Sequence, residues 1–167
     1  MKVFIAGFAA ALALGACAGG STASPAVRTD TFGTLNGARI ELTSQGGIAG
    51  LTTNWRVTHD DGSYAFVRRH ICGTTCPAPL DSASGTMSAA AADSLFTVVW
   101  GLGPTGLKDD YGLTFGAADM FEYSLRVTFD RSTKTVHADD GTMPPAMRQI
   151  VNTLVGTIDT ARALAKR

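Results

Sequence analysis

Residues 40–51 read Ile40-Glu41-Leu42-Thr43-Ser44-Gln45-Gly46-Gly47-Ile48-Ala49-Gly50-Leu51, and this stretch decides the fold. Apolar and polar residues alternate before its glycines and again in Leu51–Thr58 after them, which is the pattern of half-buried strands. Glycine adopts positive φ at little steric cost, so the glycines between the two runs predict a bulged β-hairpin. Ile48 at its tip either packs back onto the sheet or contacts a partner, and the pattern leaves both readings open.

The other periodic segments extend this hairpin into an α+β domain. Three further strands are predicted by alternation between turn signals, and two helices by apolar residues at helical spacing. The strands are 63–70, 121–129 and 134–139; one helix is 88–100, and the other, introduced by Pro144-Pro145, has apolar residues at helical spacing from Met147 to Ala161. Hairpin connections in the order β-β-β-α-β-β-α predict an antiparallel sheet of about five strands, with both amphipathic helices packed on one face.

The N-terminus resembles a bacterial lipoprotein signal. Lys2 precedes an apolar run that is too short to span a bilayer, and Leu14-Gly15-Ala16-Cys17 at its end resembles a lipobox. The alternative is an ordinary secretory signal with a chance cysteine. We expect a signal peptide at 1–16, lipid on Cys17, a flexible Gly/Ser/Thr-rich tether at 17–34 and one domain at 35–167. Ala18 after the cysteine indicates the outer membrane, facing the periplasm or the exterior.

Two cysteines in the domain are close in sequence. In an exported chain, Cys72 and Cys76 are expected to form a disulfide because the compartment is oxidising. The alternative is a metal site formed by His70 with these two cysteines. Structural zinc needs four ligands, however, and the other histidines, His59 and His137, are predicted on other strands.

Composition and motifs argue against most other functions. The chain carries 14 basic and 14 acidic residues, which gives no indication of a nucleic-acid partner. The acidic pairs Asp60-Asp61, Asp109-Asp110 and Asp139-Asp140 are interpreted as turns that expose both carboxylates to water. Gly101–Gly106 matches G-x-G-x-x-G, but it follows a helix and contains Pro104, so it is a coincidence in a loop. The sequence has no His-Glu-x-x-His, Gly-x-Ser-x-Gly or Walker motif. We therefore expect that the protein is not an enzyme and that it binds no cofactor or metal.

The segments 44–51, 88–100, 121–129 and 140–148 occur in the order found in emfourin, and the resemblance spans about Gly37 to Ala161. Emfourin is a protein inhibitor of thermolysin-like zinc metallopeptidases such as protealysin. The resemblance implies inhibition of such an enzyme. The contact would lie at the hairpin tip, formed by Gly46, Gly47, Ile48, Ala49, Gly50 and Leu51. The alternative is an envelope lipoprotein that keeps the fold as an interaction or structural module.

Overall fold

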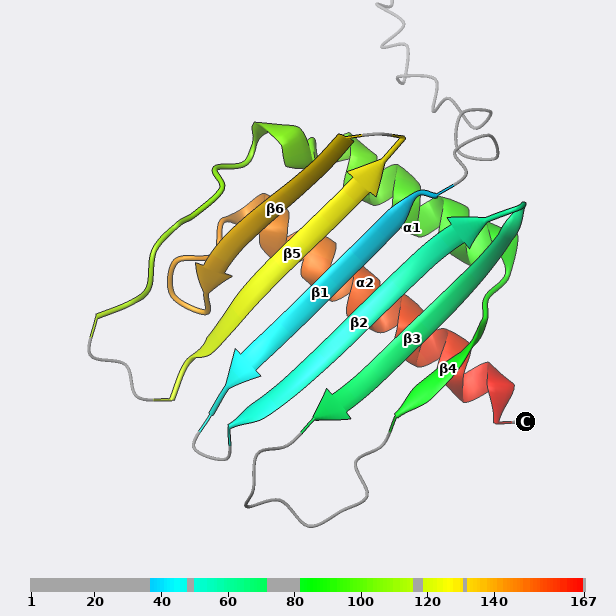
Figure 1. The fold of residues 1–167 in the computed structure, drawn as a ribbon, viewed down its shortest axis with the longest axis horizontal. Helices are drawn as coiled ribbons and strands as arrows, with labels where there is room; N and C mark the ends of the chain where they lie inside the picture. Colours follow the sequence, from blue (N-terminus) through cyan, green and yellow to red (C-terminus); the bar gives the residue numbers. More distant parts are fainter. Residues whose placement is uncertain (1–36, 48–49, 72–81, 116–118, 131, 167) are drawn as a thin grey trace, which may run out of the picture.

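The computed structural model describes residues 37–47, 50–71, 82–115, 119–130 and 132–166. These residues form one antiparallel sheet and two α-helices, which confirms the α+β prediction (Figure 1). The strands are β1 (Arg39–Gly46), β2 (Leu51–Asp60), β3 (Ser63–Ile71), β4 (Ala83–Thr86), β5 (Phe121–Phe129) and β6 (Ser132–Asp139). The helices are α1 (Ala89–Gly101) and α2 (Pro145–Ala165), with a short 3-10 turn at Pro104–Gly106 between α1 and β5.

The sheet has six strands in the order β4-β3-β2-β1-β5-β6, one more than the sequence analysis indicates. The additional strand is the edge strand β4, whose sequence Ala83-Ser84-Gly85-Thr86 has no bulky apolar residue. Gly85 itself lies close to β3, since a Cβ on it would be 3.1 Å from the ring of Phe66. Without alternating bulky apolar residues, β4 lacks the pattern by which strands are recognised in a sequence.

The first strand of the described chain lies inside the sheet. β1 pairs with β2 through the tight hairpin and with β5 on its other side, where Ile40 is opposite Val127 and Leu42 is opposite Leu125. The three-strand meander β1-β2-β3 and the hairpin β5-β6 are thereby joined along β1.

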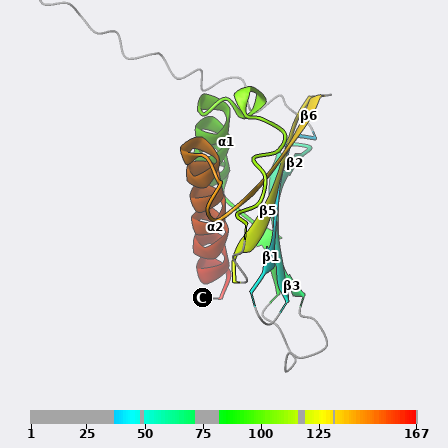
Figure 2. The same cartoon turned by 90° about the vertical axis from the view of Figure 1, so that its left-hand side faces the viewer.

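Both helices lie on one side of the sheet, as predicted (Figure 2). Ser88 accepts a hydrogen bond from the Ala91 amide at the start of α1, and Pro145 occupies the first turn of α2, where no intrahelical partner for its nitrogen is needed. The core lies between the two layers. Its fully buried side chains come from both: Ile40, Leu42, Val57, Phe66 and Leu125 from the sheet, and Leu95, Phe96, Met147, Ile150, Leu154 and Ile158 from the helices.

The opposite face of the sheet carries no helix, and Figure 2 shows it free of the other described elements. Along each strand, the residues between the core positions point to this open face, because side chains alternate across a strand. Among the described residues, no helix is long and apolar enough to cross a membrane.

Candidate functional site

The hairpin predicted from the glycine-rich stretch is present at one end of the sheet. Gly46 at the end of β1 is opposite Leu51 at the start of β2, and the Gly50 amide donates to the Gly47 carbonyl at 3.0 Å. Gly47 and Gly50 have φ values of 72° and 60°, a conformation that side chains disfavour. Ile48 and Ala49 lie outside the described residues. The turn thus uses its glycines as the sequence predicts.

One of these glycines, Gly46, also lets β5 approach the base of the hairpin. A Cβ on Gly46 would lie 2.4 Å from the Met120 carbonyl oxygen and 2.9 Å from the Phe121 Cα. A Cβ on Gly47 would lie 3.4 Å from the Phe121 ring. The backbone therefore passes through a space that only glycine fits at Gly46, and Phe121 packs beneath the turn.

Asp140 fixes the strand that supports the hairpin. Its carboxylate accepts hydrogen bonds from the Phe121 amide at 3.0 Å and from the Tyr123 hydroxyl at 2.9 Å. Burial, followed by this bond to Asp140, raises the pKa of the Tyr123 hydroxyl. Arg148, on α2, donates to the Asp140 carbonyl oxygen at 2.9 Å. The base of the hairpin is thus tied through β5 to the first turns of α2.

The neighbouring Asp139 corrects a prediction. Asp139-Asp140 is predicted to be a turn that exposes both carboxylates to water, but Asp139 is buried and Asp140 half-buried. The Asp139 carboxylate accepts hydrogen bonds from the amides of Thr114, Gly141 and Thr142 and from the hydroxyls of both threonines.

These donors stabilise the charged form of Asp139. They hold the pKa of the carboxyl well below its ordinary value, chiefly through the Thr114 amide, while burial opposes the shift. The loop before β5 is thereby fastened to the end of β6. The sequence carries a sign of these hydrogen bonds. An Asp side chain commonly accepts hydrogen bonds from the backbone amides two and three residues further on, and here those residues are Gly141 and Thr142. The pairs Asp60-Asp61 and Asp109-Asp110 are exposed, as predicted.

Three exposed apolar side chains lie at the same end of the molecule as the tip. Ile71 is the last residue of β3, and its side chain is 53% exposed. It pairs with Thr52 on β2, which pairs with Gln45 on β1, so these residues form one row across the sheet beside the hairpin. Leu113 and Phe115 flank Thr114 and are 63% and 103% exposed. Because Thr114 is bound to Asp139, which pairs with Glu122 in the same row, this loop is held beside the hairpin end.

Leu113 and Phe115 are not among the site residues predicted from the sequence. They lie between Gly112 and Gly116 in sequence, so bulky apolar residues flanked by glycines occur there as they do around Ile48. That repetition was the available signal. Exposed apolar residues gathered at one end of a domain are typical of a protein-binding surface.

The remaining predicted site residues are not brought to the tip by the described structure. Cys17, Cys72 and Cys76 lie outside the described residues. His70 shares a 2.8 Å hydrogen bond with Thr53, and His59 is buried with its ring 4.5 Å from that of Tyr64. Within the described ranges, no group of three or more His, Cys, Asp or Glu residues is placed to hold a metal ion.

No protein-family model matches this sequence, and no curated protein matches it either.

Proposed function

We propose that this protein is an inhibitor of a thermolysin-like zinc metallopeptidase that binds through the hairpin tip Gly46–Leu51. The proposal includes anchoring in the cell envelope by lipid on Cys17. It rests on the resemblance of the chain to emfourin and on one structural observation: the tip is a tight turn whose base is held by β5 and Asp140.

Preorganisation is the physical reason why such a tip suits inhibition. A free peptide loses conformational entropy when a protease cleft fixes it, whereas a turn closed within a sheet has already lost most of that entropy on folding. Thermolysin-like peptidases cleave beside bulky apolar residues, so their clefts offer an apolar pocket near the zinc. Ile48 is the bulky apolar residue of the tip, and burying such a side chain stabilises a complex by about 1.5–3 kcal/mol.

The exposed side chains around the tip extend the contact. Leu113, Phe115 and Ile71 lie at the same end of the sheet, and the loop that carries Leu113 and Phe115 is tied down by Asp139. The proposed interface thus has a central anchor on the turn and apolar side chains to either side, an arrangement common in protein–protein recognition.

The test is an inhibition assay of the purified full chain against a thermolysin-like peptidase with a chromogenic peptide substrate. Ile48→Asp should weaken inhibition by about tenfold or more, which corresponds to roughly 1.4 kcal/mol. Leu164→Asp is the matched control, because Leu164 is an exposed leucine at the far end of α2 and should inhibit like the parent.

Two results would contradict the proposed contact. If Ile48→Asp unfolds while Ile48→Ser folds and inhibits fully, then Ile48 is a packing residue and not the anchor. If Ile48→Asp folds and inhibits as well as the parent, then the contact lies elsewhere. Absence of inhibition by the parent itself would favour the non-catalytic envelope lipoprotein.

A further inference from the structure

The centre of the open face of the sheet concentrates positive charge. Pairing of the strands brings four arginines together there: Arg39 on β1, Arg56 on β2, Arg69 on β3 and Arg126 on β5. Glu41 lies among them, whereas the other acidic residues of this face, Asp60, Glu122 and Asp139, lie toward the ends of the strands. The neutral composition of the chain therefore conceals a positive centre, which only the strand register brings together.

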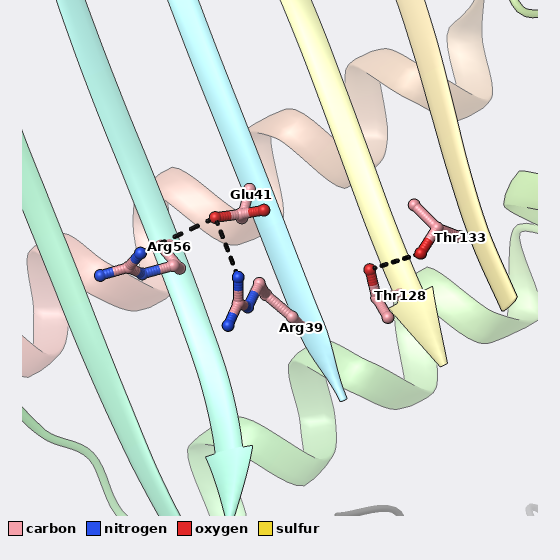
Figure 3. Close-up of polar contacts among 5 residues, drawn as sticks. All are labelled: Arg39, Glu41, Arg56, Thr128 and Thr133. Carbon is pink, nitrogen blue, oxygen red and sulfur yellow. Dashed lines mark hydrogen bonds and ion pairs between the residues drawn. The ribbon is translucent and has the colours of Figure 1, made fainter. Parts of the chain in front are cut away.

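Glu41 neutralises part of this charge but not all of it. Its carboxylate lies 3.7 Å from the Arg39 guanidinium and 3.8 Å from that of Arg56, and Figure 3 shows it between them on the side of the sheet away from the helices. Both distances exceed those of hydrogen bonds, and one carboxylate serves two cations. Within the described part of the chain, Arg69 and Arg126 have no ion pair or hydrogen bond from their side chains.

The spacing of these cations follows from the sheet. Arg56 and Arg126 are directly opposite Glu41 on its two sides, so their Cα atoms lie about 10 Å apart. Arg69 is diagonal to Arg56, at the roughly 7–8 Å that separates diagonal neighbours on a sheet face. Side chains on alternate residues of an extended chain lie about 7 Å apart. Carboxylates on every second residue of an extended segment can therefore meet neighbouring arginines.

The arginines lie around a depression that is lined by polar side chains able to form hydrogen bonds. A shallow depression of about 440 Å³ lies over the centre of this face. Its lining includes the hydroxyls and amide of Thr43, Asn54, Ser124 and Thr135 along with Glu41, Arg56, Arg69 and Arg126. Guanidinium groups bind carboxylates through two parallel hydrogen bonds, and the neutral side chains can serve the peptide groups of the same ligand.

From this arrangement we infer that the open face binds an acidic, extended segment of a partner protein. Single-stranded nucleic acid fits less well, because the described strands place no Phe, Tyr or Trp side chain on this face for bases to stack on. A second copy of this chain also fits less well, because two such faces would bring like charges together.

The experiment titrates the full chain with a synthetic peptide of alternating glutamate and serine, at low ionic strength, and follows backbone amide shifts by NMR. The expected result is shifts on β1, β2, β3 and β5, with affinity that falls as added salt screens the charges. The double variant Arg69→Gln/Arg126→Gln should bind about tenfold more weakly, since two exposed ion pairs contribute on the order of one decade together. Lys108→Gln/Lys166→Gln removes the same charge from exposed positions off this face and should bind like the parent.

Several outcomes would overturn the assignment. No measurable binding of the peptide, or equal loss in both double variants, would show that the face has no specific site. Tighter binding of a thymidine oligonucleotide than of the peptide would assign it to nucleic acid. A dimer in solution whose interface is this face would assign it to a second copy. Inhibition of a metallopeptidase by the tip is measured separately and does not depend on the result.

Discussion

Gly46 illustrates at the scale of one residue how the hairpin depends on the absence of a side chain. The backbone of Met120 and Phe121, at the start of β5, passes very close to Gly46. A Cβ on Gly46 would collide with these backbone atoms, which cannot move aside as a flexible side chain can. Gly50, at the other end of the turn, has open space around its Cα and only its backbone conformation to satisfy. The two glycines are therefore required for different reasons.

We predict that Gly46→Ala lowers the free energy of unfolding by about 2–4 kcal/mol, the combined cost of backbone strain and overpacking. Gly50→Ala should cost about 1–2 kcal/mol, because only the left-handed conformation is penalised. Urea denaturation of both variants measures the difference. Equal losses in the two variants would show that the approach of β5 does not constrain Gly46.

The residues of the candidate site were predictable in part. The glycines of the tip stand out in the sequence because glycine adopts the positive φ of such a turn more readily than any other residue. The burial of Asp139 does not stand out, since its amide partners Thr114 and Thr142 come from two separate segments of the chain. The exposure of Phe115 is equally hidden, because an aromatic residue in a loop is usually expected to pack inward. Such properties depend on contacts between segments, which local patterns do not record.

At the scale of elements, a hydrogen bond between side chains joins β3 to α1. The Tyr64 hydroxyl, on β3, donates to the Asp93 carboxylate, on α1, at 2.5 Å, and the Tyr64 ring lies between those of His59 and Phe96. Burial, and then the bond and charge of Asp93, raise the pKa of Tyr64 to about 12. The contact ties α1 to β3.

Tyr64→Phe should destabilise the protein by about 1–2 kcal/mol at pH 7, because the Asp93 carboxylate loses a donor. Tyr111→Phe is the control and should change stability by less than about 0.5 kcal/mol, because the Tyr111 hydroxyl accepts an exposed 3.2 Å hydrogen bond from the Lys108 amide that water can replace. Because the folded pKa of Tyr64 is raised, its contribution is fully present below about pH 10 and is lost as the pH rises through about 12.

Two measurements check this prediction. Urea denaturation gives the stabilities, and a tyrosinate absorbance titration should lose its step near pH 12 in Tyr64→Phe but not in Tyr111→Phe. An unchanged titration would mean that Tyr64 does not carry the raised pKa.

Elements with strong periodicity were predicted well. Phe121–Phe129 is a strand with the predicted bounds, since its alternation is unbroken, and α1 and α2 differ from the predicted helices only near their ends. β4 is not predicted because its four residues, Ala83–Thr86, include no bulky apolar side chain that could alternate with polar ones. The sheet order could not be deduced from local patterns either. The pairing of β1 with β5 joins segments far apart in the chain, and that pairing also creates the arginine-rich open face.

At the scale of the whole molecule, the proposed lipid anchor predicts where the chain resides. Cys17→Ser should move the full chain from the membrane pellet to the soluble fraction, because lipid attachment needs the cysteine thiol. The measurement is ultracentrifugal fractionation with mass spectrometry of the N-terminal peptide. Cys72→Ser is the matched control and should stay in the pellet. Unchanged partitioning of Cys17→Ser would contradict the anchor.

The central place of β1 also determines the order of events during folding. β1 can pair with β2 as soon as the first hairpin has been made, but its second partner, β5, is separated from it by β2, β3, β4 and α1. Closing that long loop makes this pairing the slow, non-local step. Until β5 docks, the backbone groups along one side of β1 are unpaired and can attract strands of other chains. The interval between the synthesis of β1 and that of β5 is therefore the period in which a nascent chain is most exposed to aggregation.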